Sequence, residues 1–247
     1  MNIIDSHLHI GNISDKDIVT PADVKTFLAS VGVNNGLVMP VALRGGYDDW
    51  EKHSILYEEA IGLGFHIALY VNPTMLDLSE DLSQFLIYPF KALKIHPDAV
   101  DFSNQQIEII CAIAEKNELP LMIHTGFDKT CHCERFRPFI RIHPHLIFVL
   151  CHARPSEEAF PMMREFSNLW IDTAFLSLKE LVTNISKDVE DRILFGTDFP
   201  VNRWFSHLGE ERRWYANQIY QIRRTLSETI ARKIFYDNYC RLYKGNF

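Results

Sequence analysis

The chain has 247 residues, of which 47% are hydrophobic and 23% are charged. This balance is typical of a globular protein with a sizeable core, and it excludes disordered and collagen-like chains. The 25 basic residues stand against 32 acidic residues, a formal charge of -7, and they form no basic run. We therefore expect no nucleic-acid partner. The 11 histidines are the conspicuous excess in this composition.

The first residues, MNIIDSHLHIGN, have no basic segment and no long apolar stretch, so we expect no signal peptide. No run approaches the ~18 apolar residues of a membrane span, so no membrane partner is expected. The five cysteines are an odd number spread through a large chain, which favours reduced thiols and a cytoplasmic location. The expected partner is a small-molecule substrate, and the sequence leaves the oligomeric state open between a monomer and a homo-oligomer.

One short motif, Cys131-His132-Cys133-Glu134, invites interpretation as a metal cluster. A structural zinc site needs further ligands at matching spacing, and the chain has no second cysteine pair. We therefore predict an exposed loop at this position.

Short apolar runs alternate with longer segments of helical spacing along the whole chain, and no Gly/Ser/Pro linker separates them. This pattern predicts a single domain over residues 1–247. Runs that are apolar throughout are typical of parallel strands buried on both faces. The predicted strands are Ile3–Ile10, Gly36–Val41, His66–Val71, Ala92–His96, Pro120–His124, Leu146–His152, Leu169–Thr173 and Ile193–Thr197.

Eight strand-then-helix repeats predict an α/β fold that closes as a (β/α)8 TIM barrel. The alternative is a doubly wound open sheet, which would show a glycine-rich turn after its first strand if it held a dinucleotide, and His9-Ile10-Gly11-Asn12 is no such turn. The C-terminal piece is expected to pack outside the barrel. This piece is Ile230–Tyr243. The predicted helices are Pro21–Val31, Asp49–Leu63, Asn104–Asn117, Glu157–Phe166, Leu178–Ile185 and one within Gly209–Leu226.

Histidines fall where barrel enzymes place functional side chains, at the ends of predicted strands. His7 and His9 are two residues apart on the first strand, so both rings project from the same face, with Asp5 below them. A second such pair, His143-Pro144-His145, is predicted to be a turn. The remaining polar residues that end predicted strands are His96, His124, His152 and Asp198.

Histidine and aspartate, the residue types at these strand ends, are common metal ligands. Zinc takes neutral imidazole nitrogens and carboxylate oxygens, and a catalytic site keeps one position for water. The predicted ligand set is His7, His9, His124 and Asp198. His152 is either a fifth ligand or a group that orients a developing oxyanion.

Five ordered motifs, IDSHLHIG, ALKIHP, LPLMIHTG, FVLCHAR and RILFGTDFP, resemble the amidohydrolase superfamily, and in detail its amidohydrolase-related branch of metal-dependent hydrolases and decarboxylases. The resemblance extends from residue 3 to about residue 243. It implies that His7, His9, His124 and Asp198 bind metal and that Asp198 takes a proton from the attacking water. It also implies that His152 either binds a second metal or contacts substrate.

The number of metals depends on Lys94. Two-metal members of the family need a bridging carboxylate, and a carboxylated Lys94 lies near the required position. The alternative is a plain cation paired with Asp198 or another carboxylate, because an unpaired buried charge is costly. In this branch a lysine two residues before a histidine accompanies a single-metal site, so we expect one metal, most simply Zn2+. His96 shares the face of Lys94 and is either a substrate contact or structural.

The predicted activity is hydrolysis of a C–O or C–N bond next to a carbonyl, in a small anionic lactone, ester or amide. The alternative within the branch is non-oxidative decarboxylation of an aromatic or unsaturated acid. A non-catalytic metal-binding barrel and a phosphoesterase of the polymerase-and-histidinol-phosphatase type fit the motifs less well.

Asp172 and Thr173 either line the mouth or cap the next helix. An arginine fork suits a carboxylate and a tryptophan suits a planar ring, so the predicted substrate contacts are Arg44, Arg154, Arg203 and Trp204. The alternative is a surface salt bridge for each arginine and a place at the edge of the core for Trp204.

Overall fold

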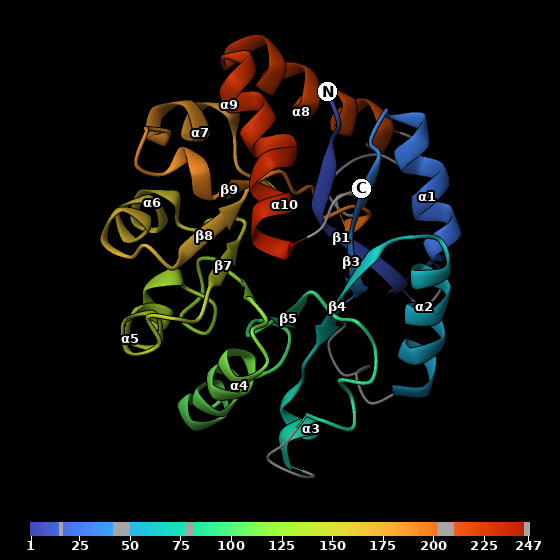
Figure 1. Cartoon of the computed structure of the whole chain (residues 1–247), viewed down its shortest axis with the longest axis vertical. Coiled ribbons are helices and arrows are strands. Elements are labelled where there is room, and N and C mark those ends of the chain that lie inside the picture. Colours follow the sequence, from blue (N-terminus) through green and yellow to red (C-terminus); the bar gives the residue numbers. More distant parts are fainter. Residues whose placement is uncertain (15–16, 42–49, 78–81, 202–209, 245–247) are drawn as a thin grey trace.

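The computed structural model describes residues 1–14, 17–41, 50–77, 82–201 and 210–244. Helices surround a central sheet, and the last helix crosses the middle of the ring (Figure 1). The strands are β1 (Ile4–Ser14), β2 (Asp17–Val19), β3 (Asn35–Pro40), β4 (His66–Tyr70), β5 (Ala92–Ile95), β6 (Leu121–His124), β7 (Phe148–Cys151), β8 (Leu169–Asp172) and β9 (Ile193–Leu194).

The predicted helices are present, most within two residues of their expected ends. Among the described residues, no helix is long and apolar enough to span a membrane. The helices are α1 (Pro21–Ser30), α2 (Trp50–Gly62), α3 (Pro73–Asp77), α4 (Asn104–Lys116), α5 (Arg137–Ile142), α6 (Ser156–Glu165), α7 (Leu178–Asn184), α8 (Glu211–Thr225), α9 (Glu228–Arg232) and α10 (Asn238–Tyr243), with single turns η1 (Cys133–Phe136), η2 (Glu190–Arg192) and the π-helical η4 (Lys233–Asp237).

The sheet closes on itself. Its order is β2-β1-β3-β4-β5-β6-β7-β8-β9, and every neighbouring pair from β1 to β9 is parallel. The ring is completed by backbone hydrogen bonds from Ser6 to Phe195 (2.8 Å), from His9 to Phe199 (2.8 Å) and from Asp198 to His7 (2.9 Å). These bonds join the first parallel strand to the last, and the predicted TIM barrel is confirmed.

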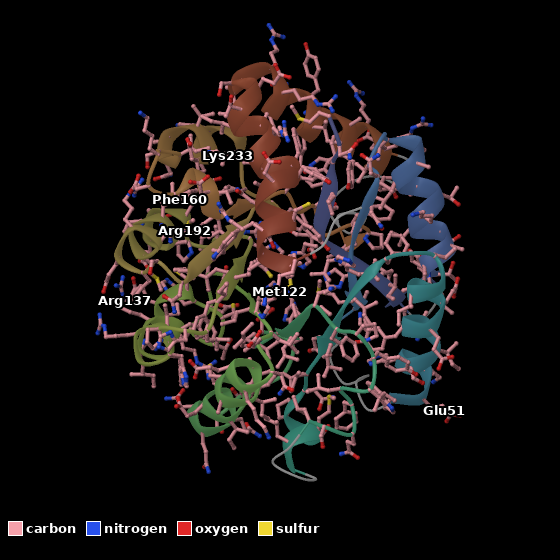
Figure 2. All side chains as sticks on the ribbon, in the orientation of Figure 1. Glu51, Met122, Arg137, Phe160, Arg192 and Lys233 are labelled. Carbon is pink, nitrogen blue, oxygen red and sulfur yellow. The ribbon has the colours of Figure 1, made fainter. Side chains whose placement is uncertain are left out.

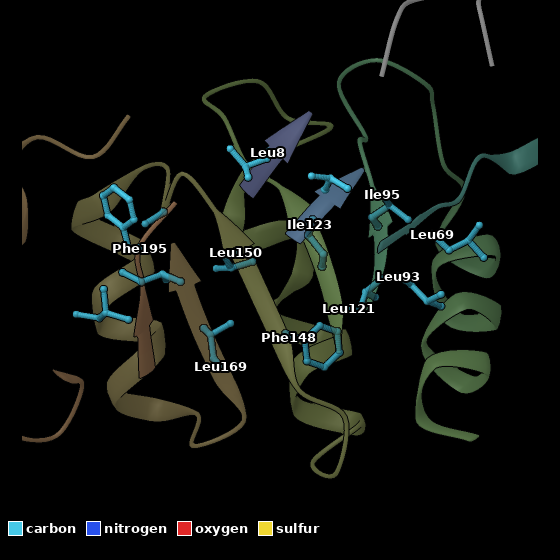
Figure 3. Packing of buried hydrophobic residues seen from close by; sticks show 14 of the residues in the cluster. Leu8, Leu69, Leu93, Ile95, Leu121, Ile123, Phe148, Leu150, Leu169 and Phe195 are labelled. Carbon is cyan, nitrogen blue, oxygen red and sulfur yellow. The ribbon is translucent and has the colours of Figure 1, made fainter. Parts of the chain in front are cut away.

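Both faces of the strands are buried, as their continuous apolarity predicts. The outward residues Leu93, Leu121 and Leu150 pack under the helices in the larger core cluster (Figure 3). The inward residues include Met122, which lies near the middle of the molecule, whereas Glu51 and Arg137 lie at its edge (Figure 2). Burial on both faces fixes the direction of each strand end, and with it the positions of the polar residues that follow.

The C-terminal helix α10 closes the floor of the barrel, whereas the preceding Ile234 and Phe235 pack in the outer core cluster, so the expectation that Ile230–Tyr243 packs outside is correct only for the first half of this piece. Tyr239, Leu242 and Tyr243 share one buried cluster with inward-facing strand residues such as Met39 and Val149. The reason is the volume of the aromatic side chains, which fill the end of the barrel that the short strands leave open. In Figure 1 this helix lies across the centre of the ring.

The first strand is longer than predicted. It continues past His9 to Ser14 and pairs antiparallel with β2, Gly11 opposite Val19. Gly11 has a φ of 94°, which favours glycine and redirects the strand. This hairpin is not predicted by the apolar pattern of the sequence, because a positive φ at one glycine leaves no periodic signal.

A close approach between β1 and β3 depends on Gly36. A Cβ atom at this position would press on the side chain of Leu8 and lie 2.7 Å from the carbonyl oxygen of Asp5. We expect Gly36→Ala to lower the free energy of unfolding by roughly 1–3 kcal/mol, measured by urea denaturation, because backbone has to move. Gly62→Ala is the control, since a Cβ there meets nothing within 4 Å. Equal stability of the two variants would contradict this account of the β1–β3 contact.

The floor of the barrel also carries a histidine with a shifted pKa. His66 Nδ1 lies 3.0 Å from the hydroxyl of Tyr239, and burial lowers the pKa of His66 to about 4. The folded state therefore binds this proton less readily than the unfolded state, so stability is complete above pH ~6.5 and is lost as the pH falls towards 4. Because the ring is partly exposed, we expect His66→Gln to remove only about 1 kcal/mol of the destabilisation between pH 7 and pH 5. Urea titrations at both pH values test this, and an unchanged difference between them in the variant would rule it out.

Candidate metal centre

Three donor atoms converge at the mouth of the barrel. His7 Nε2 lies 3.2 Å from His9 Nε2 and 3.2 Å from Asp198 Oδ1, and His9 Nε2 lies 2.8 Å from the same oxygen. All three side chains are buried. Zinc bonds of ~2.0–2.2 Å place neighbouring donors ~3.3 Å apart. The three donors are therefore spaced to hold one cation.

Hydrogen bonds at Nδ1, the nitrogen that points away from the centre, fix the orientation of His7 and His9. His7 Nδ1 donates to Asp172 Oδ2 at 2.9 Å, and His9 Nδ1 donates to the carbonyl oxygen of Pro40 at 3.2 Å. Because a carboxylate and a carbonyl only accept, each Nδ1 carries the proton and each Nε2 presents its lone pair to the centre. This is the tautomer that a metal ligand requires.

Asp198 is held as a carboxylate. Burial by itself raises the pKa of this carboxyl, but the neighbouring His7, His9 and Lys94 outweigh burial and hold the pKa well below its usual range. The residue follows β9, and its amide donates to the carbonyl of His7. A carboxylate in this state can bind a cation or accept a proton.

Three further imidazoles line the mouth beside this group. His152 Nε2 lies 3.1 Å from His124 Nδ1, and the ring of His96 stacks on that of His124 with centroids 3.7 Å apart. Donor distances place His124 in a group with His96 and Asp98, all within 4.8 Å, rather than in the set of His7, His9 and Asp198. The structure thus brings His7, His9 and Asp198 together and places His124 next to them through His152.

These three rings are neutral. Burial lowers the pKa of His96 to about 3 and holds the pKa values of His124 and His152 far below their usual range. His152 Nδ1 is buried and, within the described part of the chain, has no hydrogen-bond partner. Neutral imidazoles can bind metal or donate to an oxyanion, and His152 has a nitrogen left for such a role.

Lys94 is fully buried on β5. Its Nζ donates to Cys151 Sγ at 2.9 Å and lies 3.3 Å from His7 Nε2. Within the described residues it forms no ion pair with a carboxylate, so the expected pairing with Asp198 is not observed. Burial raises the pKa of the Cys151 thiol, and Lys94 opposes that effect.

Two buried carboxyl groups, Asp172 and Asp5, support the site through hydrogen bonds. Asp172 accepts hydrogen bonds from His7 and also from the amides of His152 and Ala174, each at 2.9 Å. Its bond from Ala174 is a local turn contact and not the predicted cap of the next helix, because the N-cap of α7 is Ser177. Its bond to His7 spans 165 residues and has no local pattern in the sequence.

Asp5 lies beneath the ligands, as predicted. It accepts a hydrogen bond from the amide of His7 at 2.9 Å and from the hydroxyls of Thr197 and Tyr215, each at 2.6 Å. Burial raises the pKa of Asp5 to about 7, although these donors oppose the rise. Asp5 therefore ties β1 to the segment that carries Asp198.

The predicted substrate contacts are only partly within the described chain. The guanidinium of Arg154 lies 5.1 Å from the ring of Phe175, and that ring lies 5.7 Å from His152. The others, Arg44, Arg203 and Trp204, lie outside the described residues. The prediction of an exposed loop at Cys131 and Cys133 is wrong, because both thiols are buried.

Comparison with known proteins identifies the family of this chain. Residues 88–245 match the family model described as amidohydrolase. No functionally curated protein matches the sequence. Similar solved structures include amidohydrolase 2 from Bifidobacterium longum subsp. infantis, which is 17% identical with a TM-score of 0.69 and full coverage of both chains.

Two other solved structures are similar over nearly all of the fold. The 4-oxalomesaconate hydratase of Rhodopseudomonas palustris is 16% identical with a TM-score of 0.68, over 98% of this chain and 95% of that one. A candidate 2-pyrone-4,6-dicarboxylic acid hydrolase of Pseudomonas putida is 13% identical with a TM-score of 0.68, over 98% and 97%. At these identities the likeness shows the fold.

Proposed function

The chain belongs to the amidohydrolase family, and from this premise we propose that it is a metal-dependent hydrolase of a C–O or C–N bond next to a carbonyl in a small anionic molecule. The observation that carries the proposal is the convergence of His7, His9 and Asp198 within 3.2 Å, with both rings fixed from behind by Asp172 and Pro40. Nitrogen and carboxylate donors in this number suit Zn2+ with one position left for water.

A divalent cation bound by these residues would supply a lowered pKa for an attacking water and polarisation of the substrate carbonyl. Asp198, which is ionised and therefore able to accept a proton, takes one from that water and returns it to the leaving group. His152, neutral and with Nδ1 unpaired, donates to the carbonyl oxygen as negative charge develops there. His124 holds the second nitrogen of His152 and so sets the angle of that ring.

An anionic substrate is supported by Arg154, whose guanidinium lies over Phe175 beside His152. A guanidinium forms a two-pronged hydrogen-bonded pair with a carboxylate, and the adjacent ring suits a flat carbon skeleton. Two of the similar structures are named for acids with several carboxylates, 4-oxalomesaconate and 2-pyrone-4,6-dicarboxylic acid. We infer that the substrate of this chain is also a small carboxylic acid.

The test is a screen of lactones, esters and amides that carry carboxylates, with protein loaded with Zn2+, stripped by a chelator, and then reloaded. We expect hydrolysis that disappears on stripping and returns on reloading. Carbon dioxide release from a parallel panel of carboxylic acids would instead identify a decarboxylase. Hydrolysis that survives complete removal of metal would exclude the proposal.

A further inference from the structure

A second group of metal-ligand side chains lies outside the barrel mouth. It consists of His132 and Cys133, at the start of η1, and Glu158, in the first turn of α6. One donor atom from each lies within 4.8 Å of the others. None of the three takes part in the centre described above.

We propose that His132, Cys133 and Glu158 form a second site for a borderline divalent cation such as Zn2+, which fastens the segment after β6 to the start of α6. The donor set is a thiol, an imidazole and a carboxylate, and these are the three side-chain types that zinc binds in proteins. The site takes the bare cation, with water completing its coordination.

The distances suit this occupant after small side-chain movements. His132 Nδ1 lies 3.5 Å from Glu158 Oε2, and zinc places neighbouring donors ~3.3–3.7 Å apart. The imidazole nitrogen also accepts a long bond, 3.4 Å, from the amide of Glu134, which costs little to release. His132 and Glu158 are 28% and 41% exposed, so both can adjust, while the fully buried Cys133 provides the fixed ligand.

One carboxylate oxygen of this group lacks a hydrogen-bond donor. Glu158 Oε2 is shielded from solvent and accepts no hydrogen bond from the described residues. The neighbouring Glu134 is already neutralised by Arg137 at 2.5 Å. The Glu158 side chain is partly exposed, but this oxygen is shielded and its nearest neighbour of opposite character is His132 at 3.5 Å, so a bound cation would stabilise it.

The thiol provides the remaining negative charge. Burial, with help from Glu158 and Glu134, raises the pKa of Cys133 to about 12, so in the absence of metal it is neutral. The weak donor Cys133 Sγ then lies 3.9 Å from the carbonyl oxygen of Pro155. A bound cation displaces the thiol proton to solvent, so its affinity increases with pH.

Such a site would act on the segments that follow two histidines of the barrel mouth. The amide of Gly126 donates to the carbonyl of Cys131, which folds the segment between them back on itself. A Cβ at Gly126 would lie 2.8 Å from Cys131 Sγ and 3.9 Å from His124 Nε2, so this segment packs directly beside His124. On the other side, α6 begins four residues after His152. A cation between η1 and α6 would therefore fix the segment that follows His124 and the segment that follows His152, without contact with the reacting atoms.

Titration of the full chain with Co2+ tests the proposal, because a cobalt–thiolate bond has a charge-transfer absorption that imidazole and carboxylate ligands lack. We expect the native protein to show this band and to bind about one equivalent beyond the barrel-mouth site. Cys133→Ser should abolish the band and that equivalent. Cys131→Ser is the matched control, since it removes an equally buried thiol two residues away, and it should keep both.

Glu158→Gln guards against a variant that fails to fold, because this side chain is partly exposed. We expect it to weaken Co2+ binding in the thiolate-detected site at least ~10-fold while circular dichroism is unchanged. Asp198→Asn should leave the band intact, so this test is independent of the hydrolase. A native protein without the band at saturating Co2+, or a band of unchanged affinity in both Cys133→Ser and Glu158→Gln, would overturn the proposal.

Discussion

Replacing Asp198 by Asn is expected to lower kcat by ~10²–10⁴-fold, the range that loss of a general base produces. The amide keeps the size of the side chain and one oxygen donor near His7 and His9, but it cannot accept a proton. The fold should persist, since the amide of residue 198 still donates to the carbonyl of His7. The measurement is kcat on the best substrate of the screen, at saturating Zn2+ so that weaker metal binding is not mistaken for slower chemistry.

Asp188→Asn is the matched control for this experiment. Asp188 is an exposed carboxylate whose partners are Ser186 and Arg164, and it has no part in the barrel-mouth centre. Its replacement should leave kcat unchanged. If Asp198→Asn kept full activity with Zn2+ bound, Asp198 would not be the proton acceptor.

Replacing Asp172 by Asn is expected to weaken Zn2+ binding by ~10–100-fold, the usual effect of removing the group that orients a metal-binding histidine. The new side-chain N–H would face His7 Nδ1. This contact favours the other tautomer of His7, in which the proton is on Nε2, the nitrogen that faces the centre. The oxygen of the new side-chain amide could still accept from the amides of His152 and Ala174. The loss of Zn2+ affinity is therefore caused by the changed tautomer of His7 and not by a change in the backbone.

Competition between the protein and a fluorescent chelator measures this affinity. Asp172→Glu offers a comparison, because it keeps an acceptor but changes its reach. We expect both variants to bind Zn2+ more weakly and only Asp172→Asn to retain the native unfolding midpoint, since the longer acid crowds a fully buried position. Native Zn2+ affinity in Asp172→Asn would show that the tautomer of His7 is set elsewhere.

The repeating elements were predictable from sequence because each depends on local pattern. The run Leu169–Thr173 became β8 at Leu169–Asp172, and the helix expected at Asn104–Asn117 begins after Ser103, whose side chain and that of Gln106 form a capping box. The β1–β2 hairpin and the position of α10 were not predictable. The first depends on Gly11 at positive φ inside a strand, and the second depends on the space left at the barrel floor.

The ligands were predictable from type and spacing, but their supports were not. His7 and His9 project from one face because strand side chains alternate. Asp172 and Lys94 meet His7 only after the barrel has closed, from strands far along the chain. Cys133 and Glu158 likewise come together because two consecutive repeats pack side by side, and no pattern in CHCE alone contains Glu158.

The closure between β1 and the segment after β9 has a kinetic consequence. The hydroxyl of Ser6 meets the carbonyl of Phe195 across 189 positions of sequence, and Asp198 reaches its neighbours on β1 over a similar span. Contacts between residues so far apart in the sequence are slow to form, because the entropy of the intervening chain must be lost before they stabilise the fold. The barrel-mouth centre therefore depends on the seam between the first and last strands, and a cation bound to both sides of that seam is expected to slow its opening.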